Sequence, residues 1–286
     1  MKVFITGCRG FIGGALAETL QKAGVFVDGT DLFECDLSDP FSDDLIERLD
    51  ACDLIIHCAA IVGVDNHLKH TNSFIINHTI DLNIIEYCQE TAKPLIYFST
   101  SEVFGHNELI TKESNFKISQ HIRSNYALEK LMAERIIRES DFDHIILRPF
   151  NVVGPTQDPK KGVIPKFFEA ARKNKTLTIY TDRHNNPARR GFLWIGDFCE
   201  LIKRIVLNFN NFKNDSYNVG APNDISIREL AHKIIELVGS KSEIKYQKPR
   251  KGDNIIFRRG LGDFEIWRKA RISGILNVDG ILKKFL

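Results

Sequence analysis

A glycine-rich run near the start of the chain constrains the fold more than any other feature. Lys2-Val-Phe-Ile-Thr6 is a β-rich segment, Gly7, Gly10 and Gly13 follow it, and apolar residues at positions 12, 16 and 20 then recur at helical spacing. Gly24 ends this helical pattern. Glycines let the backbone approach a pyrophosphate, and a helix N-terminus offers free N–H donors. The opening therefore predicts a strand, a turn that binds the diphosphate of a dinucleotide, and a helix.

The alternation of strand and helix continues to about residue 150. The stretch at 53–60 reads as apolar throughout, as a parallel strand covered on both faces should be, and further strands are expected at 95–100 and 144–148. Helical patterns at 74–91 and 121–139 lie between them. Strands that alternate with helices predict an α/β fold, a Rossmann-like doubly wound parallel sheet.

Beyond Pro149 the character of the chain changes. Residues 151–162 are rich in Gly, Pro and polar residues and predict a loop, and shorter helical and strand patterns follow. A helix within 225–238 is expected to begin at a Ser226 cap, with Glu229 three residues later. We predict a dinucleotide-binding domain over 1–155, to which 192–219 returns, and a small discontinuous C-terminal substrate lobe made of 156–191 and 220–286.

The bulk composition narrows the choice of partners. The 286 residues carry a formal net charge of +2, which does not favour nucleic-acid binding. No apolar run approaches the roughly 20 residues of a membrane span, and the first residues read as a strand, so we expect neither a membrane partner nor a signal peptide. Six cysteines without a Cys-x-x-Cys pair predict reduced thiols and a cytoplasmic protein. His67, His70 and His78 are too irregularly spaced to predict a metal site.

Aspartates near the end of the second predicted strand are candidates for a ribose contact. A carboxylate at Asp31 would accept hydrogen bonds from a ribose 2′-hydroxyl and repel a 2′-phosphate, which predicts NAD rather than NADP. Asp28 is the alternative, and Asp31 is preferred because it stands at the strand end. Asp36 is placed to meet the adenine, or else is a solvated loop residue. His57 lies within an apolar strand and is expected to be a packed structural histidine.

A tyrosine and a lysine further along the chain suggest the chemistry. In Ser124-Asn-Tyr-Ala-Leu-Glu-Lys130 the phenol of Tyr126 and the ammonium of Lys130 are four residues apart, so a helix places them on one face. Tyrosine titrates near 10, and a fixed cation beside it is expected to lower that pKa. Behind a glycine-rich opening, this pair predicts a base for an oxidation that uses the bound dinucleotide.

Together these motifs resemble a known family. Thr6-Gly-Cys-Arg-Gly-Phe-Ile-Gly13 is similar to the cofactor loop of the extended short-chain dehydrogenase/reductases, in particular their NAD-dependent nucleotide-sugar epimerase, dehydratase and decarboxylase group. His57-Cys-Ala-Ala60 is similar to the family's fourth-strand motif, and Phe98-Ser-Thr-Ser-Glu-Val-Phe-Gly105 to its active-site strand. The likeness covers roughly residues 1–240, although Phe104 stands where the family usually has Tyr and Thr156 where Arg is common.

The resemblance implies three sets of site residues. Expected at the NAD cofactor are Gly7, Gly10, Phe11, Ile12, Gly13, Asp31, Asp36, Leu37, Ala59, Ala60, Asn77, Ser99, Tyr126 and Lys130. Expected as catalytic are Thr100, Glu102, Tyr126 and Lys130. Expected at a nucleotide-diphosphate sugar are Ser101, Asn151, Val163, Tyr180 and Arg190, with Arg189 and Arg183 as alternatives to Arg190. The family also implies a homodimer built from the helices at 74–91 and 121–139.

The resemblance leaves the reaction open. In this group, oxidation at carbon 4 of the sugar gives a 4-keto intermediate, from which epimerisation, decarboxylation or dehydration can follow. Glu102 after Thr100-Ser101 resembles UDP-glucuronate decarboxylases and some 4,6-dehydratases, because 4-epimerases generally carry small uncharged residues there. A surface carboxylate at a strand end is the plainer interpretation of Glu102. We expect a lyase, with a nucleotide-sugar 4-epimerase as the alternative and a non-catalytic NAD-binding regulator as a third possibility.

Overall fold

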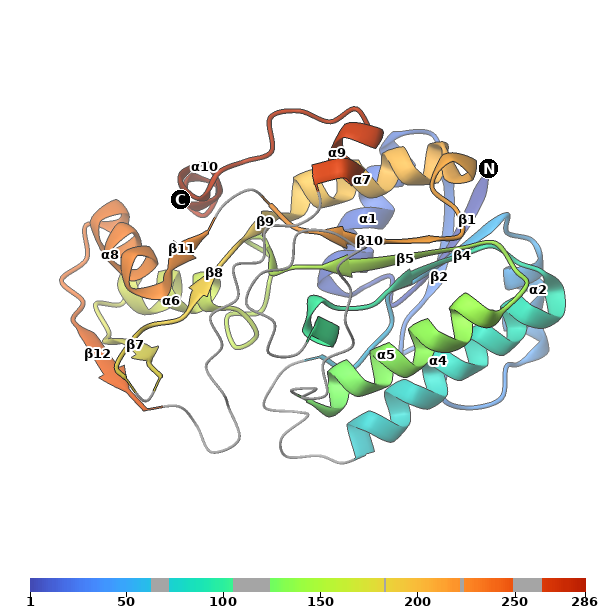
Figure 1. Cartoon of the computed structure of the whole chain (residues 1–286), viewed down its shortest axis with the longest axis horizontal. Coiled ribbons are helices and arrows are strands. Elements are labelled where there is room, and N and C mark those ends of the chain that lie inside the picture. The colour runs from blue at the N-terminus through green and yellow to red at the C-terminus, as the bar shows by residue number, and fades with distance from the viewer. Residues whose placement is uncertain (63–71, 105–123, 183, 222–223, 249–263) are drawn as a thin grey trace. The chain divides into compact units, whose positions relative to one another are not determined.

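The computed structural model describes residues 1–62, 72–104, 124–182, 184–221, 224–248 and 264–286 (Figure 1). These residues divide into two compact units. Unit 1 consists of Met1–Gly105, Ile122–Pro149 and Cys199–Asn218. The described residues of unit 2 fall within Phe150–Phe198 and Val219–Leu286.

A six-stranded sheet forms the centre of unit 1, with the strand order β10-β5-β4-β3-β1-β2. The pairs β1–β2, β1–β3, β3–β4 and β4–β5 are all parallel. The strand order reverses at β1, whose neighbours β2 and β3 lie on opposite sides, and open α/β sheets bind ligands beside such a reversal. The strands are β1 (Lys2–Thr6), β2 (Phe26–Thr30), β3 (Leu54–His57), β4 (Leu95–Phe98), β5 (His144–Pro149) and β10 (Asp215–Val219).

Helices cover both faces of this sheet, as Figure 1 shows for α1 and α7 on one face and α2, α4 and α5 on the other. Successive strand residues point to opposite faces, so β1 sends Phe4 toward α2, α4 and α5 in one buried cluster and Val3 and Ile5 to the other side. The parallel sheet predicted from the unbroken apolar strands is therefore confirmed. The helices are α1 (Phe11–Lys22), α2 (Asp43–Asp50), α4 (Asn72–Thr91), α5 (Asn125–Glu139) and α7 (Ile195–Leu207).

In its described residues, unit 2 has short two-stranded ladders and four helices, three of which contribute to an apolar cluster of its own. Helices α6 and α8 pack together, and the ring of Phe285 stacks on Phe168 of α6. The Ser226 hydroxyl accepts a hydrogen bond from the Glu229 N–H at 3.0 Å, which confirms the predicted cap. The elements are β6 (Val152–Val153), α6 (Val163–Arg172), β7 (Leu177–Tyr180), β8 (Arg189–Arg190), β9 (Leu193–Trp194), β11 (Ile225–Ser226), α8 (Ile227–Val238), β12 (Ile244–Gln247), α9 (Phe264–Lys269) and α10 (Val278–Lys283).

Two expectations about individual elements differ from the structure. Helix α2 was not predicted, although Ser42 caps it and Leu45 and Leu49 bury the apolar side of a mostly charged sequence. Its eight residues are too few to give a persistent helical period, so the signal is weak. Strand β3 covers only part of the apolar stretch 53–60, because the chain leaves the sheet after His57.

A buried ion pair joins the last strands of unit 1 to α5. Arg148 of β5 donates from Nε to Oε1 of Glu134 at 2.8 Å, and its Nη2 donates to the other carboxylate oxygen. Ser99, which follows β4, donates its hydroxyl to the same carboxylate. Arg148 and Glu134 are almost fully inaccessible to water. A pair in this environment is costly to break, since the remaining charge keeps its desolvation penalty without a partner.

We predict that Glu134→Ala lowers the free energy of unfolding by about 3–5 kcal/mol, because it strands the Arg148 guanidinium in the core. Guanidinium chloride denaturation measures the change. The control is Glu169→Ala, which removes an exposed i,i+4 pair with Lys173 and is expected to leave the unfolding midpoint unchanged. Equal losses in the two variants would contradict this account of the core.

Candidate active site

The carboxyl ends of the parallel strands bring several predicted residues to one edge of unit 1. Gly7 follows β1, Asp31 follows β2, Ala59 lies two residues after β3, and Thr100 lies two residues after β4. The loops after β1 and β3 approach closely, since a Cβ placed on Gly7 would lie 2.9 Å from the Cα of Ala59. This edge is where open α/β sheets bind their ligands.

The turn between β1 and α1 fits a diphosphate. Gly7 has φ +68°, and a Cβ on Gly13 would lie 2.1 Å from the carbonyl oxygen of Gly7, so the turn requires glycine at both positions. Gly10 caps α1 without a side-chain hydrogen bond. The first N–H groups of the helix, at Phe11, Ile12 and Gly13, have no partner within the helix and can donate to an anion. The turn thus has the backbone donors and the space that an NAD diphosphate needs.

The aspartates near β2 have different surroundings. Asp28 forms an ion pair with Arg48 at 2.7 Å. Burial alone would raise the pKa of Asp28, but the hydrogen bonds from Arg48 and from the Gly29 N–H, together with the charges of Arg48 and Lys2, outweigh burial and lower it. Asp31 instead accepts hydrogen bonds from the N–H of Arg9, in the glycine turn, at 3.0 Å and from that of Leu32. This difference favours Asp31 as the ribose contact. Asp36 accepts from Ser38, and Leu37 is buried in the core beside α2 and α4.

The N-terminus of α5 gathers the residues expected to be catalytic. Ser124 caps the helix by accepting from the N–H of Ala127, and it donates its hydroxyl to Oε2 of Glu102 at 3.2 Å. Glu102 lies in the short 3₁₀ turn η1 (Ser101–Phe104) after β4, and its own N–H donates to Oγ1 of Thr100. Tyr126 is the second residue of α5 and is half-buried. Glu102, Thr100 and Tyr126 therefore belong to one local arrangement, held by the cap.

The protein's own groups raise the pKa of Tyr126, contrary to the expectation from sequence. Burial is the largest cause, and the nearby carboxylates of Glu102, Glu129 and Asp81 add to it in that order. The spacing of four does place Lys130 on the same helix, but its ammonium is compensated. Lys130 is buried, and its Nζ donates to Asp81 at 3.1 and 3.4 Å. A cation paired with a carboxylate acts on a neighbouring phenol much less than a lone cation does.

Two residues assigned to the cofactor by resemblance have their side chains engaged inside unit 1. Asn77 of α4 hydrogen-bonds both backbone groups of Ile61, and its amide donates to Oε1 of Glu129 at 2.6 Å. Burial raises the pKa of Glu129 to about 8, and Oε2 of this residue is buried without a hydrogen-bond partner. Ser99 donates to Glu134, as described above. Sequence reasoning missed the buried carboxyls Asp81 and Glu129. Asp81 lies between Asn77 and Ile84 in a stripe at helical spacing, which is the available signal that it faces inward.

Four of the five residues expected at the substrate lie in unit 2, while Ser101 is in η1 of unit 1. Asn151 donates its amide to the carbonyl of Gly191 at 2.9 Å, Val163 begins α6, and Tyr180 ends β7. Arg190 is the second residue of β8 and donates to the carbonyl of Arg189. Arg189 donates to the carboxylate and the carbonyl of Asp224. The third candidate, Arg183, lies outside the described residues.

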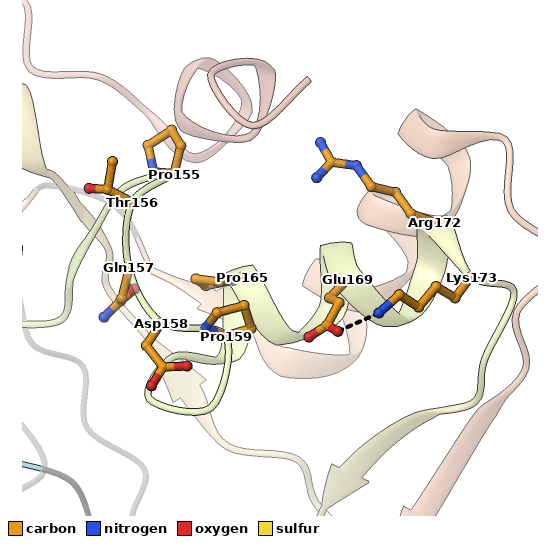
Figure 2. Close-up of a pocket in the computed structure, with 9 residues that line it drawn as sticks. All are labelled: Pro155, Thr156, Gln157, Asp158, Pro159, Pro165, Glu169, Arg172 and Lys173. Carbon is orange, nitrogen blue, oxygen red and sulfur yellow. Dashed lines mark hydrogen bonds and ion pairs between the residues drawn. The ribbon is translucent and has the colours of Figure 1, made fainter.

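A surface hollow of about 370 Å³ also lies in unit 2, between the loop that follows Gly154 and helix α6 (Figure 2). Its cations are already engaged, since Lys173 pairs with Glu169 at 2.6 Å and Arg172 donates to the carbonyl of Phe285. Thr156 lines it together with Pro155 and Gln157. Nothing in its lining points to a reaction.

The described residues contain neither a group of metal ligands nor a membrane-spanning helix. Across the described ranges, no three His, Cys, Asp or Glu side chains are grouped so that they could hold a metal ion. His67 and His70 lie outside those ranges. No helix in the described part of the chain is long and apolar enough to cross a membrane.

The fold and the site define a dinucleotide-binding protein of the Rossmann-like class with a tyrosine and a lysine beside the cofactor edge. The model of the NAD dependent epimerase/dehydratase family matches residues 3–220, and the chain belongs to this family. The family resemblance, the Rossmann-like fold and NAD as the cofactor of the family, all expected from the sequence, are thereby confirmed.

Similar proteins within the family catalyse different reactions. A dTDP-D-glucose 4,6-dehydratase from Dictyostelium discoideum is 30% identical over 82% of this chain, and the match spans 62% of that protein's own length. A UDP-N-acetyl-alpha-D-glucosaminuronate decarboxylase from Bacillus cytotoxicus is 29% identical over 85% of this chain and 82% of its own. The crystal structure of Thermus thermophilus UDP-glucose 4-epimerase with NAD has a TM-score of 0.82 at 23% identity, covering 100% of this chain and 99% of that one. The family is thus established, and the particular reaction is not.

We predict that Gly13→Ala weakens NAD⁺ binding by about 100-fold, or about 2.7 kcal/mol, because the added methyl group displaces the Gly7 carbonyl from the turn. Calorimetric titration with NAD⁺ measures the loss, and circular dichroism checks that the variant is folded. Gly14→Ala is the matched control on the same helix, since its Cβ would meet the nearest atom, the Cys8 carbonyl oxygen, at an ordinary 3.4 Å. NAD⁺ affinity that is equal in both variants would show that the turn does not bind the diphosphate.

Proposed function

We propose that this protein is an NAD-dependent nucleotide-sugar lyase that acts through a 4-keto intermediate, in the manner of UDP-glucuronate decarboxylases or 4,6-dehydratases. The observation that supports a lyase is the position of Glu102. Its carboxylate accepts a hydrogen bond from Ser124, the cap of the helix that carries Tyr126, and its charge raises the pKa of that phenol. A carboxylate held there serves the steps that follow oxidation. The NAD expected at the glycine turn, when bound, accepts a hydride from carbon 4 of the sugar and later returns it.

The residues of unit 1 divide the proton chemistry between them. Tyr126, as a phenolate, removes the proton from the sugar 4-hydroxyl. Thr100, whose Oγ1 accepts the Glu102 N–H, has a hydroxyl proton left to donate to the same sugar oxygen. Lys130 is proposed to hold the nicotinamide ribose, and because Asp81 balances its charge it favours the phenolate only weakly. Because burial and three carboxylates raise the pKa of Tyr126, the positive charge of an oxidised nicotinamide is needed to bring that pKa back toward neutrality.

Glu102 then determines the fate of the ketone. In dehydration it takes the proton from carbon 5 and passes it to the departing 6-hydroxyl, which leaves as water. In decarboxylation the carbon 5 carboxylate lies β to the ketone and leaves as CO₂, and Glu102 positions the water that returns a proton. Dehydratases of this group that use an acid–base pair usually place Asp beside the Glu, whereas this chain has Ser101. Ser101 therefore weighs toward decarboxylation within the lyase proposal.

Substrate contacts are proposed from both units. Ser101, Asn151, Val163 and Tyr180 are proposed to line the nucleotide-sugar site. The planar fork of Arg190 suits a diphosphate or a sugar carboxylate, either of which it would bind through two parallel hydrogen bonds. If the substrate is a sugar acid, Arg190 would bind the sugar carboxylate instead of the diphosphate. We propose a cytoplasmic setting, where such activated sugars are made.

A 4-epimerase is the second candidate. Tyr126, Thr100 and Lys130 are all that oxidation and return of the hydride to the opposite face require, and the Thermus epimerase shares the fold. In that case Glu102 would be only a structural partner of Ser124. A non-catalytic regulator is less favoured, because the chain keeps both Tyr126 and Lys130.

We also propose a homodimer in which α4 and α5 of two copies form a four-helix interface. Ile75 of α4 and Leu128 and Met132 of α5 are apolar side chains exposed on these helices. We expect Leu128→Glu with Met132→Glu to shift the protein from dimer to monomer, because the pair would bury two carboxylates in the interface. Size-exclusion chromatography with light scattering measures the mass. A wild-type protein that is monomeric at micromolar concentration would refute the dimer.

We predict that Glu102→Gln abolishes loss of water and strongly slows formation of the decarboxylated product, because glutamine cannot accept the carbon 5 proton or orient the protonating water as a carboxylate does. The wild-type enzyme is incubated with a panel of UDP-, GDP- and dTDP-sugars, and the products are weighed by mass spectrometry. Loss of CO₂ indicates decarboxylation, loss of water indicates dehydration, and a changed sugar of unchanged mass indicates epimerisation. Glu200→Gln, on the exposed side of α7, is the control. A lyase rate that Glu102→Gln leaves intact would remove this residue from the mechanism.

A further inference from the structure

Asp81 lies at the centre of a buried polar cluster in unit 1. His57 of β3 is 3.0 Å from Oδ1 through its Nε2, Tyr97 of β4 donates its hydroxyl to Oδ2 at 2.6 Å, and Lys130 of α5 donates to both oxygens. These side chains and Thr6 are at most 2% exposed. Two strands and two helices therefore meet at one carboxylate, and none of these contacts reaches solvent.

The hydrogen bonds fix the charges within this cluster. Burial alone would raise the pKa of Asp81, but Lys130 and the hydrogen bonds from His57 and Tyr97 outweigh burial and lower it. Burial lowers the pKa of His57, so its ring is neutral at pH 7. An ionised Asp81 only accepts, and so the proton of His57 is on Nε2 while Nδ1 accepts from the hydroxyl of Thr6 at 2.7 Å. The oxygen of Thr6 in turn accepts the N–H groups of Cys58 and Ala59, beside Gly7. The cluster thus contains one anion and one cation, Asp81 and Lys130.

Lys130 lies on α5 one helical turn after Tyr126, whose phenol the proposed reaction uses. Asp81 is among the groups that disfavour ionisation of Tyr126, together with burial, Glu102 and Glu129. The ammonium of Lys130 also lies 4.6 Å from the centre of the Tyr97 ring, which keeps it on the sheet side of α5. The titratable and charged groups around Lys130 and Tyr126 are Asp81 from α4, His57 from β3, Tyr97 from β4, Glu102 from η1, and Glu129 and Glu134 from α5.

We propose that Asp81 is a positioning residue: it holds the Lys130 ammonium and balances its charge, so that Lys130 acts on Tyr126 as half of a neutral buried pair. The inference rests on the proposed use of Tyr126 as the base. It means that the phenol of this enzyme stays protonated to higher pH than an unpaired lysine would allow, and that the positive nicotinamide supplies the missing charge. The base is then available mainly when oxidised cofactor is bound.

Asp81→Asn tests this with little change in shape. The amide oxygen at the Oδ1 position can still accept from His57 and Lys130, and the amide N–H₂ can donate to the oxygen of Tyr97. Only the negative charge is lost. We expect the acidic limb of the pH profile of kcat/KM to move about one pH unit lower, a roughly tenfold larger phenolate fraction on that limb. An unmoved limb, or one moved to higher pH, would overturn the proposal even if kcat falls.

A second readout does not depend on turnover. The full chain, with tyrosine carbon-13 labelled at Cζ and saturated with NAD⁺, is titrated by NMR, and the signal absent in Tyr126→Phe identifies the phenol. Its midpoint should also fall in Asp81→Asn, whereas Asp50→Asn, which removes an aspartate acceptor from the Tyr87 hydroxyl, should leave it in place. In the Lys130→Met background the same substitution should shift the midpoint less, because without Lys130 the buried Asp81 is less readily ionised and its replacement by Asn removes less negative charge. An equal shift in that background would contradict charge balancing through Lys130.

The two proposals fail in different ways. A midpoint that moves in Asp81→Asn, in a protein that converts no nucleotide sugar, would refute the proposed reaction and leave the role of Asp81 intact. Turnover with an unmoved midpoint would refute the role of Asp81 and leave the reaction intact.

Discussion

One buried carboxylate, Asp81, ties together the parts of unit 1 that carry its functional residues. Asp81 accepts hydrogen bonds from Tyr97 of β4, Lys130 of α5 and His57 of β3. The other ring nitrogen of His57 is hydrogen-bonded to Thr6 at the end of β1. Thr6 immediately precedes the first glycine of the diphosphate turn, and Lys130 is one turn of helix after Tyr126. Removing the charge from water is costly, and only a full set of partners repays that cost. The cluster therefore fixes the glycine turn and the base-carrying helix to the same sheet.

The same arrangement sets the electrostatics of the site. The simple idea of a tyrosine made acidic by a neighbouring lysine does not hold for this chain, because the lysine has a closer partner of opposite charge. Burial, Glu102, Glu129 and Asp81 all oppose a phenolate. Because ionisation of Tyr126 is disfavoured in this way, the phenol can act as a base only when a further positive charge is close to it. The oxidised nicotinamide of the family's cofactor carries that charge, so binding of the oxidised cofactor would also activate the Tyr126 base.

Much of unit 1 could be predicted from the sequence, because its signals are local. The glycines at 7, 10 and 13 require a turn between strand and helix, and the apolar runs of β3, β4 and β5 require a sheet covered on both faces. Helix α2 was missed because eight residues barely show a period. The partners of Asp81 come from positions 57, 97 and 130, Thr6 reaches it only through His57, and only the folded sheet brings these residues together. Likewise, Tyr126 and Lys130 could be found by spacing, but the pKa of Tyr126 depends on carboxylates from three separate elements, which spacing does not reveal.

The central claim is that the Tyr126 hydroxyl, ionised beside oxidised cofactor, starts the reaction. Stopped-flow absorbance of the reduced nicotinamide, after mixing the NAD⁺-loaded enzyme with a nucleotide sugar that it converts, tests it most directly. The account predicts a transient reduction whose rate rises with pH along a single ionisation, and which is absent in Tyr126→Phe. A transient of the same rate and pH dependence in Tyr126→Phe would contradict it.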